Sequence, residues 1–182
     1  AERDILGVKV AVLDRTRAIR LIEDRLASGA FTRLAFLNAH CSNVAWRDDN
    51  YRAALSNFLV LADGVGVDIA SRALHGEEFP GNLNGTDFIP DLLATIRQPQ
   101  RVGLLGSTPE NVEKAAEGFR RIAPQHEFVV VSDGYFRETD IPALLQSSDL
   151  RNSELAEQIG VSFLHKRSHT LLQDLRRFMI EH

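Results

Sequence analysis

Two polar segments, each directly after an apolar run, carry side chains suited to proton transfer. Asp63 stands in Asp63-Gly64-Val65-Gly66 after the apolar residues 58–61, and Asn38 and His40 follow the apolar residues 34–37. A strand that ends in such a turn delivers its polar side chain to the carboxyl edge of a sheet, where open α/β folds bind ligands. Asp63 is therefore predicted to be a catalytic base, with Asn38 and His40 beside it. The alternative is that Asp63 caps the following helix and Asn38 closes a turn, because both types are ordinary cap and turn residues.

A second glycine-containing segment has the composition of a phosphate-binding turn. Gly106, Ser107 and Thr108 follow an apolar run and precede an amphipathic helix. Glycine lets the backbone approach a phosphate, and the start of a helix offers free N–H groups and the positive end of the helix dipole. The segment matches neither the G-x-G-x-x-G pattern nor a Walker loop, although a dehydrogenase with Asp133 as the acid after the next strand stays an alternative. A structural alternative is a tight turn in which Ser107 or Thr108 only caps the helix.

The elements that position these residues follow from the apolar periodicity. Strict alternation and short apolar runs predict strands, whereas apolar residues at every third or fourth position predict helices. The predicted strands are 8–12, 34–37, 58–61, 101–106 and 127–131, and the predicted helices are 18–26, 43–57, 65–74, 86–96 and 111–122. Strands that alternate with helices indicate an α/β fold, with a single domain, a mostly parallel sheet, helices on both faces and a Rossmann-like arrangement.

Some residues have predicted local roles within this fold. Thr86 is the predicted cap of the helix that follows it, and residues 75–85 form a polar loop of a length that is usually functional or mobile. Trp46 and Tyr51 are predicted to be core or interface residues.

Length, charge and cysteine content exclude several classes of protein. The 182 residues suit one domain, and a net charge of −4 without a polybasic patch makes nucleic acid an unexpected partner. No apolar run approaches the roughly 18 residues that span a bilayer, and the charged start is unlike a signal peptide, so we expect a cytoplasmic protein, soluble or peripheral. The single cysteine, Cys41, fits a reducing compartment and a small buried residue, the alternative being a nucleophile near His40. No Cys/His spacing resembles a zinc site.

Five motifs follow one another in a fixed order and spacing over residues 5–137. They are Asn38-Ala39-His40, Ala62-Asp63-Gly64-Val65-Gly66, Asn84-Gly85-Thr86-Asp87-Phe88, Val102-Gly103-Leu104-Leu105-Gly106-Ser107 and Asp133-Gly134-Tyr135-Phe136. Together they resemble the WecG/TagA/CpsF glycosyltransferase family, glycosyltransferase family 26. The resemblance implies an inverting transferase that needs neither metal nor cofactor. It would move N-acetylmannosamine or a related N-acetylhexosamine from a UDP donor to a polyprenyl-diphosphate-linked acceptor, for wall teichoic acid, enterobacterial common antigen or exopolysaccharide.

The resemblance also implies roles for individual residues. Asp63 would be the base that takes the proton of the acceptor hydroxyl, with Asn38 as its catalytic partner. The implied substrate-binding residues are His40, Asn84, Gly85, Thr86 and Asp87, and the implied nucleotide-binding residues are Gly106, Ser107, Gly134 and Tyr135. Two alternatives stay open: His40 is a hydrogen-bonded residue at a strand end, and Tyr135 packs against the protein instead of stacking on uridine.

Two features depart from the family pattern. Family members usually carry arginine where this chain has Asn82, and they have a Gly-x-Pro-x-Gln-Glu motif after the Asp-Gly-Tyr-Phe segment that is absent here. The second function left open is therefore a shortened, non-catalytic nucleotide-sugar-binding or regulatory α/β protein. The oligomeric state also stays open, a homo-oligomer included.

Residues 138–182 are predicted to form an atypical tail that completes the sheet, after a glycosyltransferase domain at 1–137. The tail is predicted to contain helices at 141–145 and 154–159, a strand at 161–164 and a helix at 170–180. It bears a faint resemblance to the end of a response-regulator receiver domain, with Lys166 after the strand. The last helix has an apolar face beside Arg176 and Arg177. This pattern predicts either a helix packed on the sheet, with Leu175 and Phe178 buried, or contact with the inner face of a membrane.

Overall fold

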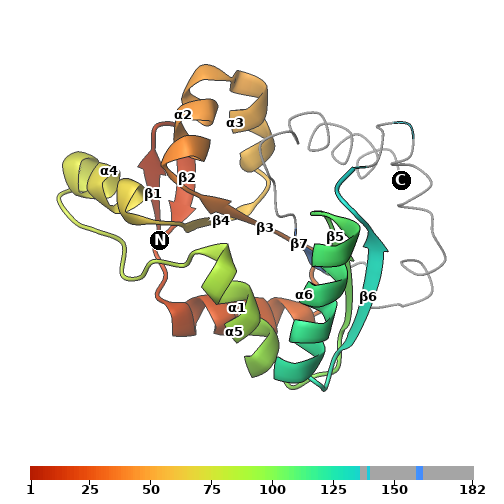
Figure 1. Cartoon of the computed structure of the whole chain (residues 1–182). Coiled ribbons are helices and arrows are strands. Elements are labelled where there is room, and N and C mark those ends of the chain that lie inside the picture. Colours follow the sequence, from red (N-terminus) through yellow and green to blue (C-terminus); the bar gives the residue numbers. More distant parts are fainter. Residues whose placement is uncertain (136–138, 140–158, 162–182) are drawn as a thin grey trace. The chain divides into compact units, whose positions relative to one another are not determined.

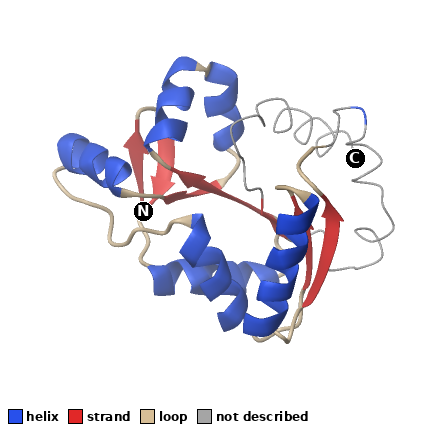
Figure 2. Ribbon diagram, in the orientation of Figure 1, coloured by secondary structure: helices blue, strands red, loops and turns tan. Residues whose placement is uncertain are grey.

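The computed structural model describes residues 1–135, 139 and 159–161 and has a mixed α/β fold, shown in Figure 1 and coloured by secondary structure in Figure 2. Contacts within the chain divide it into two compact units. The first comprises Ala1–Ile89 with Ile159–Val161, and the second comprises Pro90–Gln158 with Ser162–His182. Asp63 therefore belongs to the first unit and Gly106 to the second.

The first unit contains a hairpin, a parallel sheet and several helices. Its strands are β1 (Glu2–Ile5), β2 (Val8–Ala11), β3 (Thr32–Leu37), β4 (Leu59–Ala62) and β7 (Ile159–Val161). Its helices are α1 (Arg15–Ala27), α2 (Ala39–Arg47), α3 (Asp49–Leu55), α4 (Val65–His75) and the start of α5 (Gly85–Thr95). β1 and β2 pair antiparallel, whereas β4, β3 and β7 form a parallel sheet in that order.

The second unit contains the rest of α5, then β5 (Arg101–Leu105), α6 (Pro109–Ile122) and β6 (Glu127–Ser132). β5 and β6 pair parallel, with an irregularity between Leu104 and Leu105. His126 is buried just before β6, where its Nδ1 accepts the Gln100 N–H at 3.1 Å and its Nε2 lies 2.8 Å from the Leu93 carbonyl oxygen. Because Nδ1 faces a donor, the ring proton is on Nε2, which donates to Leu93. This histidine thus joins α5 to the segments that precede β5 and β6.

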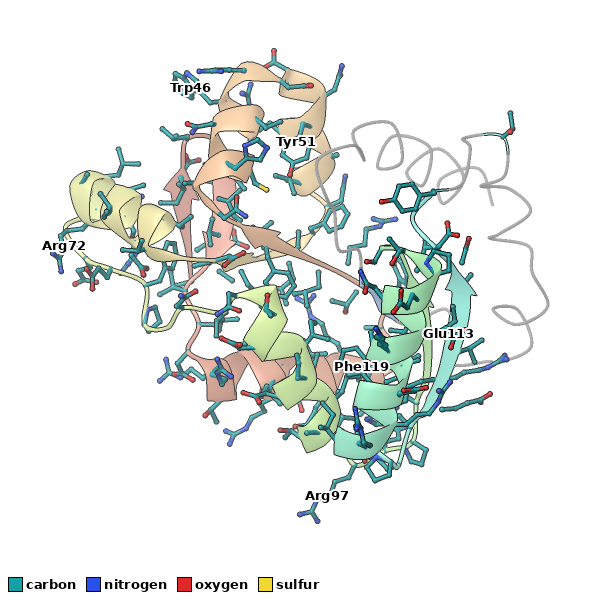
Figure 3. The ribbon with its side chains drawn as sticks, viewed as in Figure 1. Trp46, Tyr51, Arg72, Arg97, Glu113 and Phe119 are labelled. Carbon is teal, nitrogen blue, oxygen red and sulfur yellow. The ribbon has the colours of Figure 1, made fainter. Side chains whose placement is uncertain are left out.

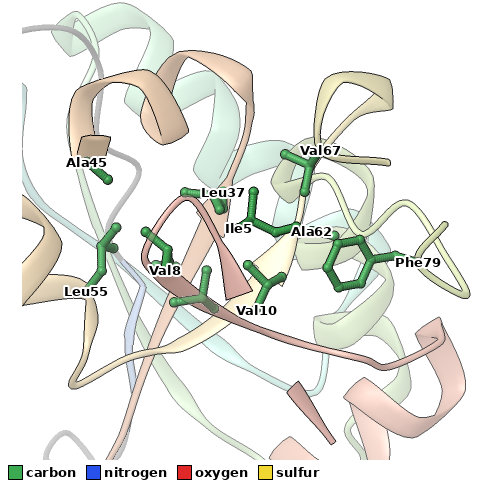
Figure 4. Packing of buried hydrophobic residues seen from close by; sticks show 11 residues of the cluster. Ile5, Val8, Val10, Leu37, Ala45, Leu55, Ala62, Val67 and Phe79 are labelled. Carbon is green, nitrogen blue, oxygen red and sulfur yellow. The ribbon is translucent and has the colours of Figure 1, made fainter. Parts of the chain in front are cut away.

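A cluster of buried apolar side chains joins the hairpin, the sheet and the helices of the first unit (Figure 4). Ile5 and Val10 are fully buried, and Leu37 is 1% exposed. Burial of such a side chain stabilises the fold by about 1.5–3 kcal/mol. Leu37 and Ala62 are the last residues of β3 and β4, and both belong to this cluster. The backbone that carries Asn38 and Asp63 is therefore anchored in the core.

Most of the predicted elements in the described part of the chain are confirmed. The helix at 111–122 begins at Pro109, and Thr108 caps it by accepting the Asn111 N–H at 3.3 Å. The strand at 127–131 is β6, and the helix at 65–74 is α4. β1 was not predicted, because its charged residues Glu2 to Asp4 hide the strand pattern.

Two local predictions are wrong, and a third is narrowed. The single helix at 43–57 is two helices, because the extended residue Asp48 accepts the N–H groups of Asn50 and Tyr51 and so starts α3. Thr86 does not cap α5; the preceding Asn84 does. Trp46, predicted to be a core or interface residue, is 63% exposed on α2, which excludes the core and leaves the interface as a prediction (Figure 3), whereas Tyr51 packs against the core cluster.

Most predictions for the tail lie outside the described residues. They include the helices at 141–145 and 170–180, Lys166, the basic pair Arg176 and Arg177, and the burial of Leu175 and Phe178. Ile159, predicted to end a helix, is instead the first residue of β7, which pairs with β3. Among the described residues, no helix is long and apolar enough to cross a membrane.

Candidate active site

The parallel register of β3 and β4 brings Asn38 and Asp63 to the same edge of the sheet. Leu37 is paired with Ala62, so the residue that follows each strand leaves the sheet at the same level. The Asp63 N–H donates to the Leu37 carbonyl oxygen at 2.9 Å, which extends the ladder by one residue. The predicted proximity of these two side chains is the direct result of this register.

Gly64 and Gly66, which follow Asp63, are needed for two different structural reasons. Gly64 has φ +90° and ψ 163°, a combination that only glycine adopts readily, and this turn leads directly into α4. Gly66 lies against α2, where an added Cβ would stand 2.8 Å from the Cβ of Ala39. The N-terminal cap of α4 is Gly64, without a side-chain hydrogen bond, so Asp63 does not cap this helix. The alternative reading of Asp63 as a helix cap is therefore wrong.

The side chain of Asn38 connects the start of α2 to the Asp63 carboxylate. Its Oδ1 accepts the Cys41 N–H at 2.9 Å and caps α2, so the expected cap role is present. Its amide group is left to donate the hydrogen bond that Asp63 receives. Burial raises the pKa of Asp63, and the hydrogen bond from Asn38 lowers it, with burial the larger effect. A carboxylate whose pKa is raised is a stronger base for an alcohol proton.

His40 lies in the first turn of α2, two residues after Asn38, and its side chain is exposed. Among the described residues we find no hydrogen bond to its ring. The alternative of a hydrogen-bonded strand-end histidine therefore has no support in this part of the chain.

Asn84 and Asp87, predicted to bind substrate, bind each other at the start of α5. Asn84 Nδ2 donates to the Asp87 carboxylate at 2.9 Å, and the Asp87 N–H donates to Asn84 Oδ1 at 3.0 Å. Gly85 is buried and Thr86 is exposed. The Leu83 N–H donates to the Ala62 carbonyl oxygen at 2.8 Å, so this segment starts beside the end of β4. The four predicted residues thus form a helix cap that leaves Thr86 and Asp87 accessible.

In the second unit, the turns after β5 and β6 lie against each other. The Gly134 N–H donates to the Ser107 carbonyl oxygen at 2.8 Å, and an added Cβ at Gly134 would lie 2.9 Å from the Ser107 nitrogen. Gly106 has φ +126° and Ser107 has φ +63°. A left-handed serine is uncommon, and such strain concentrates at functional sites. The expectation that Ser107 or Thr108 caps the helix is confirmed for Thr108, which is the cap of α6.

Tyr135 follows this pair of turns and is 73% exposed, so its ring is not packed in the core. Its N–H donates to the Asp133 side chain at 2.8 Å. Asp133 therefore shapes the turn that presents Tyr135.

Two contacts in the first unit have no signal in the local sequence. Burial, together with the neighbouring Cys41, raises the pKa of the Tyr51 hydroxyl, which hydrogen-bonds to the Cys41 side chain. Cys41 is half-buried and packs against the core cluster, as expected of a small apolar residue. The other contact is that of Asn82, whose Oδ1 accepts the Gly64 N–H at 2.9 Å. No local pattern signals this contact, because it joins residues 18 positions apart.

The described residues contain no group of three or more His, Cys, Asp or Glu side chains placed to hold a metal ion. The candidate catalytic group of the first unit is Asp63, half-buried at the end of the parallel sheet and hydrogen-bonded by Asn38.

A comparison with family models matches residues 3–159 to the glycosyl transferase WecG/TagA/CpsF family. The chain belongs to this family. The match runs past Phe136, where the last of the five motifs ends, to Ile159, the first residue of β7. No curated protein matches the chain. Membership makes the protein one of a family of glycosyltransferases, which in general use a sugar-nucleotide donor and a lipid-linked acceptor.

Proposed function

We propose that this protein is an inverting glycosyltransferase that moves an N-acetylhexosamine, such as N-acetylmannosamine, from UDP to a polyprenyl-diphosphate-linked acceptor. The observation that carries the proposal is Asp63. It stands at the carboxyl end of β4 with a pKa raised by burial and with Asn38 as its hydrogen-bond donor. Family membership supplies the reaction class.

In the proposed reaction the acceptor hydroxyl oxygen attacks the anomeric carbon of the donor sugar. Asp63 takes the hydroxyl proton, the new glycosidic bond forms, and the bond to UDP breaks with inversion at that carbon. A positioned base of this kind contributes roughly 10²–10⁴-fold to the rate. Asn38 keeps the carboxylate oriented, and the exposed His40, Thr86 and Asp87 are available to sugar hydroxyls.

We assign donor binding to the paired turns of the second unit. The backbone after Gly106 opens α6, a helix of 14 residues, whose first N–H groups and dipole favour a diphosphate. The exposed ring of Tyr135 is suited to stacking on uracil. The developing negative charge of UDP would then be stabilised by backbone groups, without a metal ion or a cofactor.

The remaining parts of the proposal concern context. A lipid-linked acceptor would place the enzyme on the inner face of the plasma membrane, peripheral to the cytoplasm, in exopolysaccharide or related cell-envelope synthesis. A Rossmann-like arrangement would suit the nucleotide. The net charge of −4 offers no attraction for nucleic acid.

The test is transfer of radiolabelled sugar to a short-chain prenyl-diphosphate acceptor. Asp63→Asn should lower kcat by ~10²-fold or more while titration with UDP-sugar gives an unchanged Kd. Asp68→Asn is the matched control, because Asp68 accepts the Phe79 N–H at 3.3 Å, a bond that asparagine can keep. Near-wild-type turnover in Asp63→Asn would remove Asp63 as the base. UDP binding without any transfer by the wild type would instead favour the non-catalytic nucleotide-sugar-binding protein.

A further inference from the structure

The loop between α4 and α5 is fastened to the first unit at several points. Phe79 is 6% exposed and belongs to the core cluster, and its N–H donates to Asp68. Leu83 is 1% exposed, and its N–H donates to the Ala62 carbonyl oxygen at 2.8 Å. Although the loop is polar in sequence, its two buried side chains give it a fixed path.

Arg3 of β1 fastens the start of the same loop. Its guanidinium donates to the carbonyl oxygens of Glu77 and Glu78 at 3.1 and 2.8 Å, to Ser71 Oγ at 3.0 Å and to the Glu77 carboxylate at 2.6 Å. It also lies 5.4 Å from the centre of the Phe79 ring. The Arg3 side chain is only 15% exposed, whereas the Glu77 carboxylate that it binds is 75% exposed. The backbone of the loop is therefore fixed by hydrogen bonds on both sides of Asn82.

Asn82 uses this fixed position to contact the turn that carries Asp63. Its side-chain oxygen accepts the Gly64 N–H at 2.9 Å. The facing atom must be the oxygen, because an amide N–H needs an acceptor. Gly64 has a φ of +90° and no side-chain cap of its own, and the local hydrogen bond from the Val67 N–H at 3.1 Å holds its carbonyl group but not its N–H.

We propose that Asn82 is a positioning residue for Asp63, an inference that rests on the proposed function of Asp63 as the base. The backbone on both sides of the Asp63 side chain is hydrogen-bonded: its own N–H to Leu37, and the next N–H to Asn82. With both peptide planes held, the carboxylate stays against Asn38. Without the contact from Asn82, the Asp63–Gly64 peptide is free to rotate, and the base loses its alignment.

The first experiment measures the contact without requiring activity. In amide hydrogen exchange, Gly64 should exchange about tenfold faster in Asn82→Ala than in the wild type. Asn82→Asp should keep the slow exchange, because a carboxylate oxygen also accepts the N–H. Asn57→Ala is the control, since Asn57 is exposed and precedes β4, whose length of about 10 Å at about 3.3 Å per residue separates it from the Asp63 turn. An unchanged Gly64 exchange rate in Asn82→Ala would overturn the inference.

The second experiment separates positioning from folding. At alkaline pH, Asn82→Ala should lower kcat about tenfold with KM for UDP-sugar unchanged, whereas Asn82→Asp should stay within about threefold of the wild type. Asn82→Asp adds a negative charge near Asp63 and should move the acid limb of its pH–rate profile to higher pH; Asn57→Asp should not. Equal kcat values for wild type and Asn82→Ala would overturn the inference. A wild type without transfer activity would defeat the proposed function, and the Gly64 exchange rate would still decide whether Asn82 holds the turn.

Discussion

Replacing Gly66 by alanine is expected to destabilise the first unit, because α4 approaches α2 too closely there for a side chain. The added Cβ would lie 2.8 Å from the Cβ of Ala39, whereas carbon atoms in contact are normally ~3.5–4.0 Å apart. Ala39 is the first residue of α2 and has no flexible end that can turn away. One helix must therefore move by about 1 Å relative to the other.

Two opposing contributions set the magnitude. Replacement of glycine by alanine within a helix stabilises it by up to about 1 kcal/mol, less in the first turn. Overpacking costs about 1–3 kcal/mol, so we expect a net loss of roughly 1–2 kcal/mol. Gly118 in α6 is the matched control, because a Cβ there meets nothing within 4 Å. Gly118→Ala should stabilise the protein by roughly 1 kcal/mol.

The assay is urea denaturation at pH 7, followed by circular dichroism. The double variant Gly66→Ala with Ala39→Gly removes the opposing methyl group, so the two changes should couple favourably by about 1 kcal/mol or more. Because Asn38 caps α2 and α4 follows the Asp63 turn, Gly66→Ala should also lower kcat, and the double variant should recover part of it. A stabilisation equal to that of Gly118→Ala, or no coupling with Ala39→Gly, would refute the close approach of the helices.

Four further predictions address the turn, the base, the second unit and the absence of a metal. Gly64→Ala should cost roughly 1–3 kcal/mol because of its φ of +90°, whereas Gly81→Ala, with ordinary contacts at 3.7 Å, should change little; equal melting temperatures would contradict this. The raised pKa of Asp63 means that its charge costs the folded state stability above that pKa, a cost that vanishes as pH falls. Asp63→Asn should therefore gain stability relative to the wild type as pH rises from the usual aspartate range to 7, and a flat difference between their urea midpoints would argue against the raised pKa. His126→Ala should lower the stability of the second unit by about 1–3 kcal/mol, because the buried Gln100 N–H loses its acceptor, whereas the Leu93 carbonyl oxygen keeps the hydrogen bond from Gln125; unchanged exchange protection of β6 would contradict that role. Sugar transfer should survive EDTA, and loss of activity restored by a divalent cation would disprove metal-independent departure of UDP.

Much of the secondary structure, and the choice of Asn38 and Asp63 as candidate catalytic residues, followed from the local sequence. Apolar alternation located β2, and capping residues such as Thr108 located the start of α6, because these signals act over a few residues. Asp63 and Asn38 could be singled out because each follows an apolar strand. The same local reasoning went wrong at Asp48 and Thr86, where the side chain that actually caps the helix is one of several polar neighbours with similar propensity.

Contacts between distant segments were beyond such reasoning. β1 could not be predicted, because its charged residues obscure the alternating pattern of a strand. One of them, Arg3, donates hydrogen bonds to the backbone of the loop after α4. Asn82 looked like a departure from the family pattern, yet its oxygen completes the Gly64 turn. The role of His126 had no signal in the sequence, because both of its hydrogen-bond partners are backbone groups, 26 and 33 residues away along the chain.

The sequence by itself determined which chemical groups are available: a carboxylate on a glycine turn, an amide after the preceding strand, and an ordered set of motifs that places the chain in its family. Only the tertiary structure decided how those groups act. The parallel register of β3 and β4 put Asn38 against Asp63, and burial at that edge raised the pKa of the carboxyl group. The physical reason is that hydrogen-bond propensity and hydrophobic periodicity are local properties of a chain, whereas register, burial and the electrostatic environment arise only when distant segments pack together.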